Sequence, residues 1–221
     1  MKLLVFADLH GNRNALKKIV AKSEKNKPDA IVCAGDLTIF ESGIHSILFT
    51  LSMLKVPVMV VPGNHEGSAT LKKACGHFSN IKFIHSDKFI LGNSCFIGYG
   101  GGGFSVIDEG FERAAKKLEE FSSTHKSSNQ HHKQGNKQDN KMCRKSDNNI
   151  IMAFHAPPHG TKLDWLHGQH CGNKSYRQFI EKVQPELVVC GHLHENRGKK
   201  DYIGRTLIIN PGPEGEIIAL R

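Results

Sequence analysis

The hydrophobic pattern in the first third of the chain alternates short apolar runs with longer segments of helical periodicity. Apolar runs at 2–7, 30–34 and 56–61 are typical of buried strands. The segments 14–25 and 42–55 between them have the spacing of amphipathic helices. This order predicts a βαβαβ unit whose strands pair in parallel.

The rest of the chain continues with strands and helices in a different arrangement. Short apolar runs at 81–85, 88–91 and 94–98 predict strands joined by short turns, and so a change to meander pairing. The elements expected after them are a helix at 108–121, a strand at 150–155, a helix at 174–183, a strand at 187–190, and a closing pair of strands at 206–210 and 216–220. Two packed sheets with helices outside satisfy this order.

One segment, 122–149, differs sharply in composition from the rest. Met142 and Cys143 are its only appreciably apolar residues, so it cannot repay the entropy of ordering by burial. We expect a disordered surface loop, inserted in a single domain that spans 1–221.

The overall composition excludes a membrane protein. Hydrophobic residues make up 38% and charged residues 23% of the 221 residues, as in ordinary globular proteins. No stretch approaches the roughly 20 apolar residues that a membrane span needs. The apolar N-terminal run ends at Asp8, too soon for a signal peptide, so the expected location is the cytoplasm.

The net charge of +9 raises the question of nucleic-acid binding. The segment 122–149 holds six basic and two acidic residues, and so accounts for a net +4 of that charge. An aromatic content of 7% offers no obvious platform for stacking bases. A nucleic-acid partner is therefore not expected. The six cysteines form no CxxC pair, which excludes a zinc ribbon or a thioredoxin-type motif.

Polar side chains follow each of the first three predicted strands. Asp8 and His10 come after the first strand, Asp36 after the second and Asn64 after the third, with a glycine directly before Asp36 and Asn64. Because open α/β sheets place their sites at the carboxyl ends of strands, we expect these loops to converge. The glycines allow the backbone to turn closely around a small centre.

The second half of the chain repeats this arrangement with histidines. His155 ends one predicted strand, and His192 and His194 follow another. The candidate ligands are therefore Asp8, His10, Asp36, Asn64, His155, His192 and His194. Each motif alone is an ordinary turn or loop, but all of them at strand ends predict a metal centre. Oxygen and nitrogen ligands without thiolate suit Mn²⁺, Fe, Zn²⁺ or Ni²⁺ better than Ca²⁺.

The order of these motifs resembles that of the calcineurin-like metallophosphoesterases. The matching motifs are D-x-H at 8–10, G-D at 35–36, G-N-H-E at 63–66, a strand-ending His155 and G-H-x-H at 191–194. Together they span nearly the whole chain. The resemblance implies a four-layer α/β/β/α sandwich of two mixed sheets, with a centre of two divalent cations for which Mn²⁺ is the first expectation.

The resemblance also implies a role for each residue. Asp8, His10 and His194 would hold the first metal, Asn64, His155 and His192 the second, and Asp36 would bridge both. His65 would assist the leaving group, by protonating it or by stabilising its charge. Glu66 fits the acidic end of the family's third motif.

Residues 155–213 resemble a narrower, microbial and archaeal branch that is related to cyclic-nucleotide phosphodiesterases. The similar stretches are 155–161, 163–164, 184–195 and 210–213. The expected substrate is a small phosphoester, with nucleotides among the candidates. The glycine-rich run 98–103 lacks the Lys-Ser/Thr of a P-loop, and we expect a flexible loop near the site.

The sequence is compatible with three alternative functions. The first is hydrolysis of a phosphomonoester or phosphodiester by a hydroxide activated between two metals. The second is a nuclease-type phosphodiesterase that acts on nucleic acid, for which the basic charge would be relevant. The third is a non-catalytic scaffold that kept the fold. A scaffold should have lost ligands or His65, and the chain retains all of them.

Overall fold

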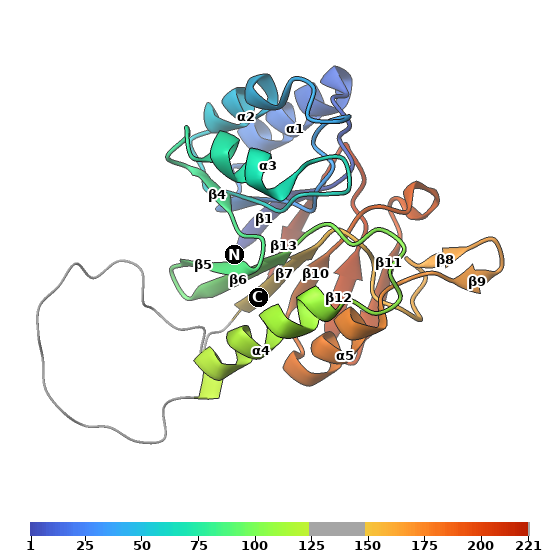
Figure 1. Ribbon diagram of the computed structural model, residues 1–221. Coiled ribbons are helices and arrows are strands. Elements are labelled where there is room, and N and C mark those ends of the chain that lie inside the picture. Colours follow the sequence, from blue (N-terminus) through green and yellow to red (C-terminus); the bar gives the residue numbers. More distant parts are fainter. Residues whose placement is uncertain (124–148, 221) are drawn as a thin grey trace, which may run out of the picture.

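The computed structural model of the protein describes residues 1–123 and 149–220. In these residues two large β-sheets pack face to face, and helices cover the outer face of each (Figure 1). The helices over the first sheet are α1 (Arg13–Asn26), α2 (Ile44–Ser52) and α3 (Ser68–Cys75). Those over the second are α4 (Glu109–Ser123) and α5 (Lys174–Val183). The predicted four-layer α/β/β/α sandwich is confirmed.

The first sheet contains the predicted βαβαβ unit. Across the sheet its strands are β13 (Glu216–Ala219), β1 (Lys2–Phe6), β2 (Ala30–Cys33), β3 (Val58–Val60) and β4 (Ile81–Phe83). The pairs β1–β2, β2–β3 and β3–β4 are parallel, and β13 runs antiparallel beside β1. Parallel pairing brings the carboxyl ends of these strands to one edge of the sheet.

The second sheet is also mixed. Across it the strands are β11 (Lys200–Ile203), β12 (Thr206–Ile209), β10 (Leu187–Val189), β7 (Asn149–Phe154), β6 (Ser94–Tyr99) and β5 (Asp87–Leu91). The four central strands are parallel, and the edge strands β5 and β11 are antiparallel to their neighbours. Its parallel strands therefore also share one carboxyl edge.

Alternation along the strands divides the apolar residues among three layers of core. On β1, Leu4 and Phe6 face the helices α1–α3, while Leu3 and Val5 face the second sheet. On β7, Met152 faces α4 and α5 on the other side of that sheet. Successive side chains of a strand point to opposite faces, so each strand contributes to two cores at once.

The predicted meander is wrong in one respect. The strands β5 and β6 do form an antiparallel hairpin, but β4 belongs to the first sheet, where it pairs in parallel with β3. Ile84 is buried between the sheets, and the chain crosses there from one sheet to the other. A short turn in the sequence does not distinguish a hairpin from such a crossing, because both need only a few polar residues.

The predicted closing pair is also wrong, because β12 and β13 lie in different sheets. Asn210, Pro211 and Gly212 connect them across the sandwich. The partner of β12 is β11, whose sequence begins Lys-Asp-Tyr and lacks the apolar alternation of a core strand. Edge strands often carry such polar residues, and this one was not predicted.

Two further predictions concern regions outside the core. The polar insert expected at 122–149 lies, from 124 to 148, outside the described residues. Within the described part of the chain, no helix has both the length and the apolar character that crossing a membrane requires.

Candidate metal centre

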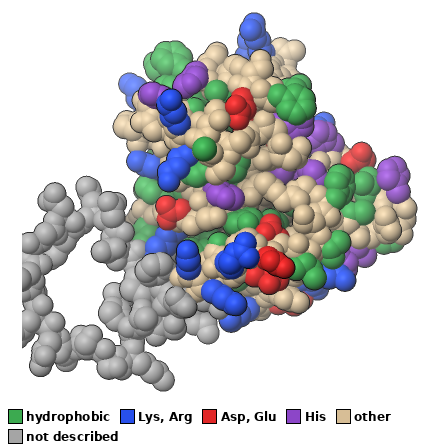
Figure 2. Space-filling model, in the orientation of Figure 1, with side chains coloured by type: hydrophobic (Ala, Val, Ile, Leu, Met, Phe, Trp, Pro, Cys, Tyr) green, Lys and Arg blue, Asp and Glu red, His purple; other side chains and the backbone are tan. Residues whose placement is uncertain are grey.

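The loops after β1, β2, β3, β7 and β10 meet at one edge of the sandwich, where the carboxyl ends of the parallel strands of both sheets come together. Backbone hydrogen bonds join them: Asp8 N donates to Gly35 O at 3.1 Å, and His10 N donates to Asp36 O at 2.9 Å. From the second sheet, Gly191 N donates to His155 O at 2.9 Å. Figure 2 shows histidine side chains gathered where the two halves of the molecule meet.

The backbone at this edge turns more sharply than side chains usually allow. Asp8, His10, Asp36 and His192 have φ values of 56°, 45°, 52° and 67°, in the left-handed region that disfavours residues other than glycine. Each such residue costs on the order of 1–3 kcal/mol, and the cost persists only where the surroundings impose it. The strain falls on four of the seven predicted ligands, which is typical of functional sites.

The glycines that precede the ligands are required for space. A Cβ atom added to Gly63 would lie 1.8 Å from Asp36 Oδ1, and one added to Gly35 would lie 2.6 Å from His155 Nδ1. Both distances are far below van der Waals contact. The glycines of the G-D and G-N motifs are therefore needed because two loops approach each other closely around Asp36.

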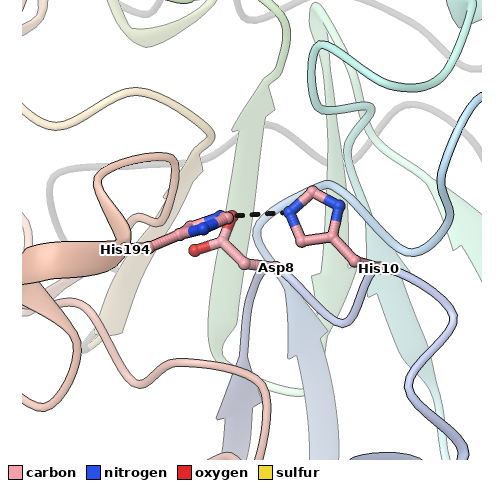
Figure 3. Close-up of side chains that lie close together, drawn as sticks. All are labelled: Asp8, His10 and His194. Carbon is pink, nitrogen blue, oxygen red and sulfur yellow. Dashed lines mark hydrogen bonds and ion pairs between the residues drawn. The ribbon is translucent and has the colours of Figure 1, made fainter.

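The first predicted group of ligands is brought together from opposite halves of the molecule. His10 Nε2 and His194 Nε2 lie 3.0 Å apart, and His194 Nε2 lies 4.0 Å from Asp8 Oδ1 (Figure 3). Asp8 and His10 follow β1, whereas His194 begins the short 3-10 helix η1 (His194–Asn196) after β10. One ligand atom from each of these three side chains lies within 4.8 Å of the others, a spacing that can hold a metal ion.

The second predicted group also converges. Asn64 Oδ1 lies 2.9 Å from His155 Nε2 and 3.0 Å from His192 Nδ1. His155 Nδ1 lies 2.9 Å from the carbonyl oxygen of Ala34 and donates to it, which directs Nε2 toward Asn64 and Asp36. That nitrogen faces only oxygen acceptors on Asn64 and Asp36, so the geometry suits a cation between them.

Asp36 lies between the two groups. Its Oδ2 atom is 3.5 Å from His10 Nε2 and 3.4 Å from His155 Nε2, one member of each group. Burial alone raises the pKa of this carboxyl, but the hydrogen bond and charge of His155, together with the backbone N–H of His65, lower the pKa to about 2. Asp36 is therefore ionised at neutral pH and reaches both groups.

The pKa values of the histidines at the centre shift in opposite directions. Burial lowers the pKa of His155, but its hydrogen bond to Asp36 and the charge of that carboxylate outweigh burial and raise the pKa overall. Burial lowers the pKa of His192 to about 4, helped by the charge of His155. Burial also lowers the pKa of His194. His192 is thus neutral at pH 7, the form in which imidazole binds a metal.

Buried polar atoms without partners support a metal at this edge. Among the described residues, the buried side-chain atoms that make no hydrogen bond are Asp8 Oδ2, His65 Nδ1 and His192 Nε2 at this edge, and Asn149 Oδ1 at the start of β7. Buried polar atoms in proteins are nearly always paired, so unpaired atoms gathered at one edge indicate a site built for a ligand. The donor set fits divalent cations that prefer nitrogen and oxygen.

His65 lies beside two of the predicted ligands, His10 and Asp36. Its backbone N–H donates to Asp36 Oδ1 at 3.0 Å, and its ring packs edge-on against His10 with centroids 4.8 Å apart. On the other side the exposed ring of Phe40 lies 4.9 Å away. A ring nitrogen of His65 also falls within 4.8 Å of ligand atoms of His10 and Asp36, so geometry alone does not separate a proton donor from a ligand.

Glu66, expected as the acidic end of its motif, has a structural role. Its buried carboxylate accepts from Thr38 N at 2.7 Å, Thr38 Oγ1 at 2.8 Å and Gly63 N at 3.0 Å. These bonds fasten the loop after β3 to the loop after β2. Since those loops carry Asn64 and Asp36, Glu66 fixes the distance between ligands without touching the centre.

The glycine-rich run 98–103 lies beside the centre. Gly101 N donates to Pro62 O at 2.9 Å, and Gly100 N donates to His85 Nδ1 at 2.9 Å. Sequence reasoning gave His85 no role, because no motif links it to a loop 15 residues away. The exposed ring of Phe104, just after the run, lies 4.7 Å from that of His192. Neither Phe104 nor Phe40, the aromatic neighbour of His65, lies in a motif that would have predicted its place beside the site.

The family of this chain follows from its match to a family model. The model for calcineurin-like phosphoesterases matches residues 1–196 of this chain. The chain belongs to that family. The calcineurin-like phosphoesterases are metal-dependent hydrolases of phosphoesters, and the candidate ligand groups at the sheet edge agree with this membership.

Individual relatives are similar to this chain over most of its length. An uncharacterized protein of Methanocaldococcus jannaschii is 27% identical over 99% of this chain and 91% of its own length. A probable glycerophosphodiester phosphodiesterase of Arcobacter nitrofigilis is 25% identical over 77% of this chain, but only 58% of that protein is covered. The crystal structure of TT1561 from Thermus thermophilus has a TM-score of 0.71 at 17% identity, covering 96% of this chain and 90% of its own.

Proposed function

We propose that this calcineurin-like protein hydrolyses a small phosphomonoester or phosphodiester with a centre of two divalent cations. The observation that carries the proposal is the position of Asp36, whose single Oδ2 atom lies within 3.5 Å of histidines from two separate groups. A carboxylate in that position suits the shared ligand of two metals. A single-metal site would need only one of the groups.

The ligands divide as the family resemblance implies. Asp8, His10 and His194 would hold one cation, Asn64, His155 and His192 the other, and Asp36 both. Mn²⁺ is the first candidate, with Fe, Zn²⁺ and Ni²⁺ as alternatives that suit the same donors. When bound, two such cations would activate a water molecule and offset the charge of the phosphate oxygens.

The protein's own residues supply the proton chemistry. We assign His65 to the leaving group, because its ring lies against His10 at the edge of the centre and the Phe40 ring holds it from the far side. A histidine in that place can give a proton to the departing oxygen, a contribution of typically 10²–10⁴ in rate. The ring of Phe104 lies against that of His192, a proposed ligand of the second metal.

The similarity to a probable glycerophosphodiester phosphodiesterase favours a phosphodiester over a monoester. The decisive assay uses purified protein with Mn²⁺, and p-nitrophenyl phosphate beside bis-p-nitrophenyl phosphate. We expect turnover of the diester to exceed that of the monoester. Turnover of the monoester alone would assign a phosphatase. No turnover of either substrate with Mn²⁺, Ni²⁺ or Co²⁺ would contradict the proposal and favour a non-catalytic scaffold.

A further inference from the structure

A cavity of about 290 Å³ adjoins the metal centre and shares His10 with it. The start of α1 forms one wall, through Arg13 and Leu16, and the segment leading into α2 together with the first turn of α2 forms the other, through Ile39 and Ser46. The cavity is therefore continuous with the centre but extends away from it, between the first two helices. Apart from His10, none of its lining residues is among the proposed ligands.

The lining of this cavity combines apolar and positive character. Leu16, Ile39 and Ile47 supply aliphatic surface, and the guanidinium of Arg13 supplies a charge. No acidic side chain is among the described residues that line it. The nearby Glu41 is occupied elsewhere, since its carboxylate accepts from Gly67 N at 2.9 Å.

The backbone adds to this positive field. Arg13 is the first residue of α1, and the cavity also borders the first turn of α2, whose cap residue Gly43 provides no side-chain hydrogen bond. The amino end of α2, a helix of 9 residues, thus borders the same space as the guanidinium, whereas the first N–H groups of α1 already donate to the side chain of Asn12. A helix amino end favours negative groups, so that of α2 reinforces Arg13.

The cavity lies on the same side of the centre as His65. Ile39 lines the cavity, and the next residue, Phe40, packs against the ring of His65. His65 in turn packs against His10, which the cavity and the centre share. The group that His65 protonates is the leaving group, so the leaving group departs next to this opening.

We infer that the cavity binds the leaving group of the substrate and selects an alcohol or phenol whose apolar stem ends in a second anionic group. The aliphatic walls would hold the stem, and Arg13 would pair with the anion. The inference rests on the proposed phosphoesterase function and deepens it. Arg13 is then a specificity-determining residue of the reaction.

The test compares two leaving groups of similar acidity and different charge. Phenyl phosphate and 4-(carboxymethyl)phenyl phosphate, and the methyl diester of each, are assayed with Mn²⁺ by the release of the phenol. Because a charge-assisted hydrogen bond to Arg13 forms only with the carboxylate, we expect kcat/KM to be about tenfold higher for the carboxymethyl compound. The measured quantity is the ratio of the two kcat/KM values.

Variants connect this ratio to the cavity. Arg13→Gln should bring the ratio close to one, and Arg13→Glu should bring it below one through repulsion of the carboxylate. Lys17→Gln is the matched control, since Lys17 is an exposed cation one turn further along α1 that does not line the cavity. That control should keep the native ratio.

The outcomes separate the two proposals. A native ratio near one, with both compounds hydrolysed, would overturn the cavity's role and leave the phosphoesterase function standing. A high ratio that Arg13→Gln does not change would also overturn it. Failure of the native protein to hydrolyse any of the compounds would contradict the phosphoesterase function, and this inference with it.

Discussion

Replacing Asp36 with asparagine is expected to remove both metals and to abolish turnover. The Oδ2 atom lies 3.5 Å from His10 Nε2 and 3.4 Å from His155 Nε2, so the charge lost is the one shared by both ligand groups. Asparagine keeps an oxygen that can accept from the backbone N–H of His65, as Asp36 Oδ1 does at 3.0 Å, and the loop therefore keeps its anchor. Elemental analysis of the dialysed protein gives the metal content, and hydrolysis of a chromogenic diester gives the rate.

The matched control for this substitution is Asp87→Asn, an exposed aspartate on β5 that lies outside the candidate ligand groups. It should retain the native metal content and rate. If Asp36→Asn still bound two equivalents of metal and turned over at the native rate, Asp36 would not be the bridging ligand.

Replacing His65 with alanine is expected to slow turnover by roughly 10²–10⁴-fold while the metals stay bound. The reason is that alanine removes the proton donor but keeps the backbone N–H that anchors Asp36. The loss should be larger for phenyl esters than for p-nitrophenyl esters, because the more acidic p-nitrophenol leaves without a proton. Elemental analysis and steady-state rates on both esters measure these effects.

This variant decides a question that distance alone leaves open, since a nitrogen of His65 lies within 4.8 Å of ligand atoms of His10 and Asp36. Loss of one metal equivalent in His65→Ala would mean that His65 is a ligand, and the assigned role would be wrong. An equal loss of rate on both esters would also contradict proton donation. His77→Ala, which removes an exposed histidine from the loop after α3, is the control.

The parallel unit of the fold could be predicted from the sequence because its strands are buried on both faces. Continuous apolar runs such as Leu3–Phe6 separate clearly from the amphipathic helices between them. The assignment of strands to sheets could not be predicted in the same way. Nothing local in 81–98 or 206–219 indicates that Ile84 or Pro211 carries the chain from one sheet to the other.

Helix α3 and strand β11 were missed for a related reason. The buried side chains of α3 are Leu71, Ala74 and Cys75, and its first turn is polar, so its periodicity is weak. Strand β11 begins with Lys200 at the edge of its sheet, where polar residues are tolerated. Both elements are held by contacts with neighbours that are distant in the sequence.

The ligand-type residues of the site could be found from the sequence, whereas the residues that position them could not. Asp8, Asp36 and His155 each end a strand in a motif of recognisable chemistry. The hydrogen bonds between Thr38 and Glu66 depend on loops that meet only in the folded chain. The position of Arg13 beside the centre depends on such loops as well. Their residue types are common in turns and helix starts, so the sequence alone gives them no distinct role.

The most direct test of the two-metal centre is a titration of metal-stripped protein with Mn²⁺, followed by hydrolysis of bis-p-nitrophenyl phosphate at each step. Six ligands divided into two groups of three around Asp36 predict that activity rises until two equivalents of metal per chain are bound, and then remains constant. Full activity at one equivalent, or two equivalents bound without hydrolysis of any phosphoester, would contradict the proposed centre.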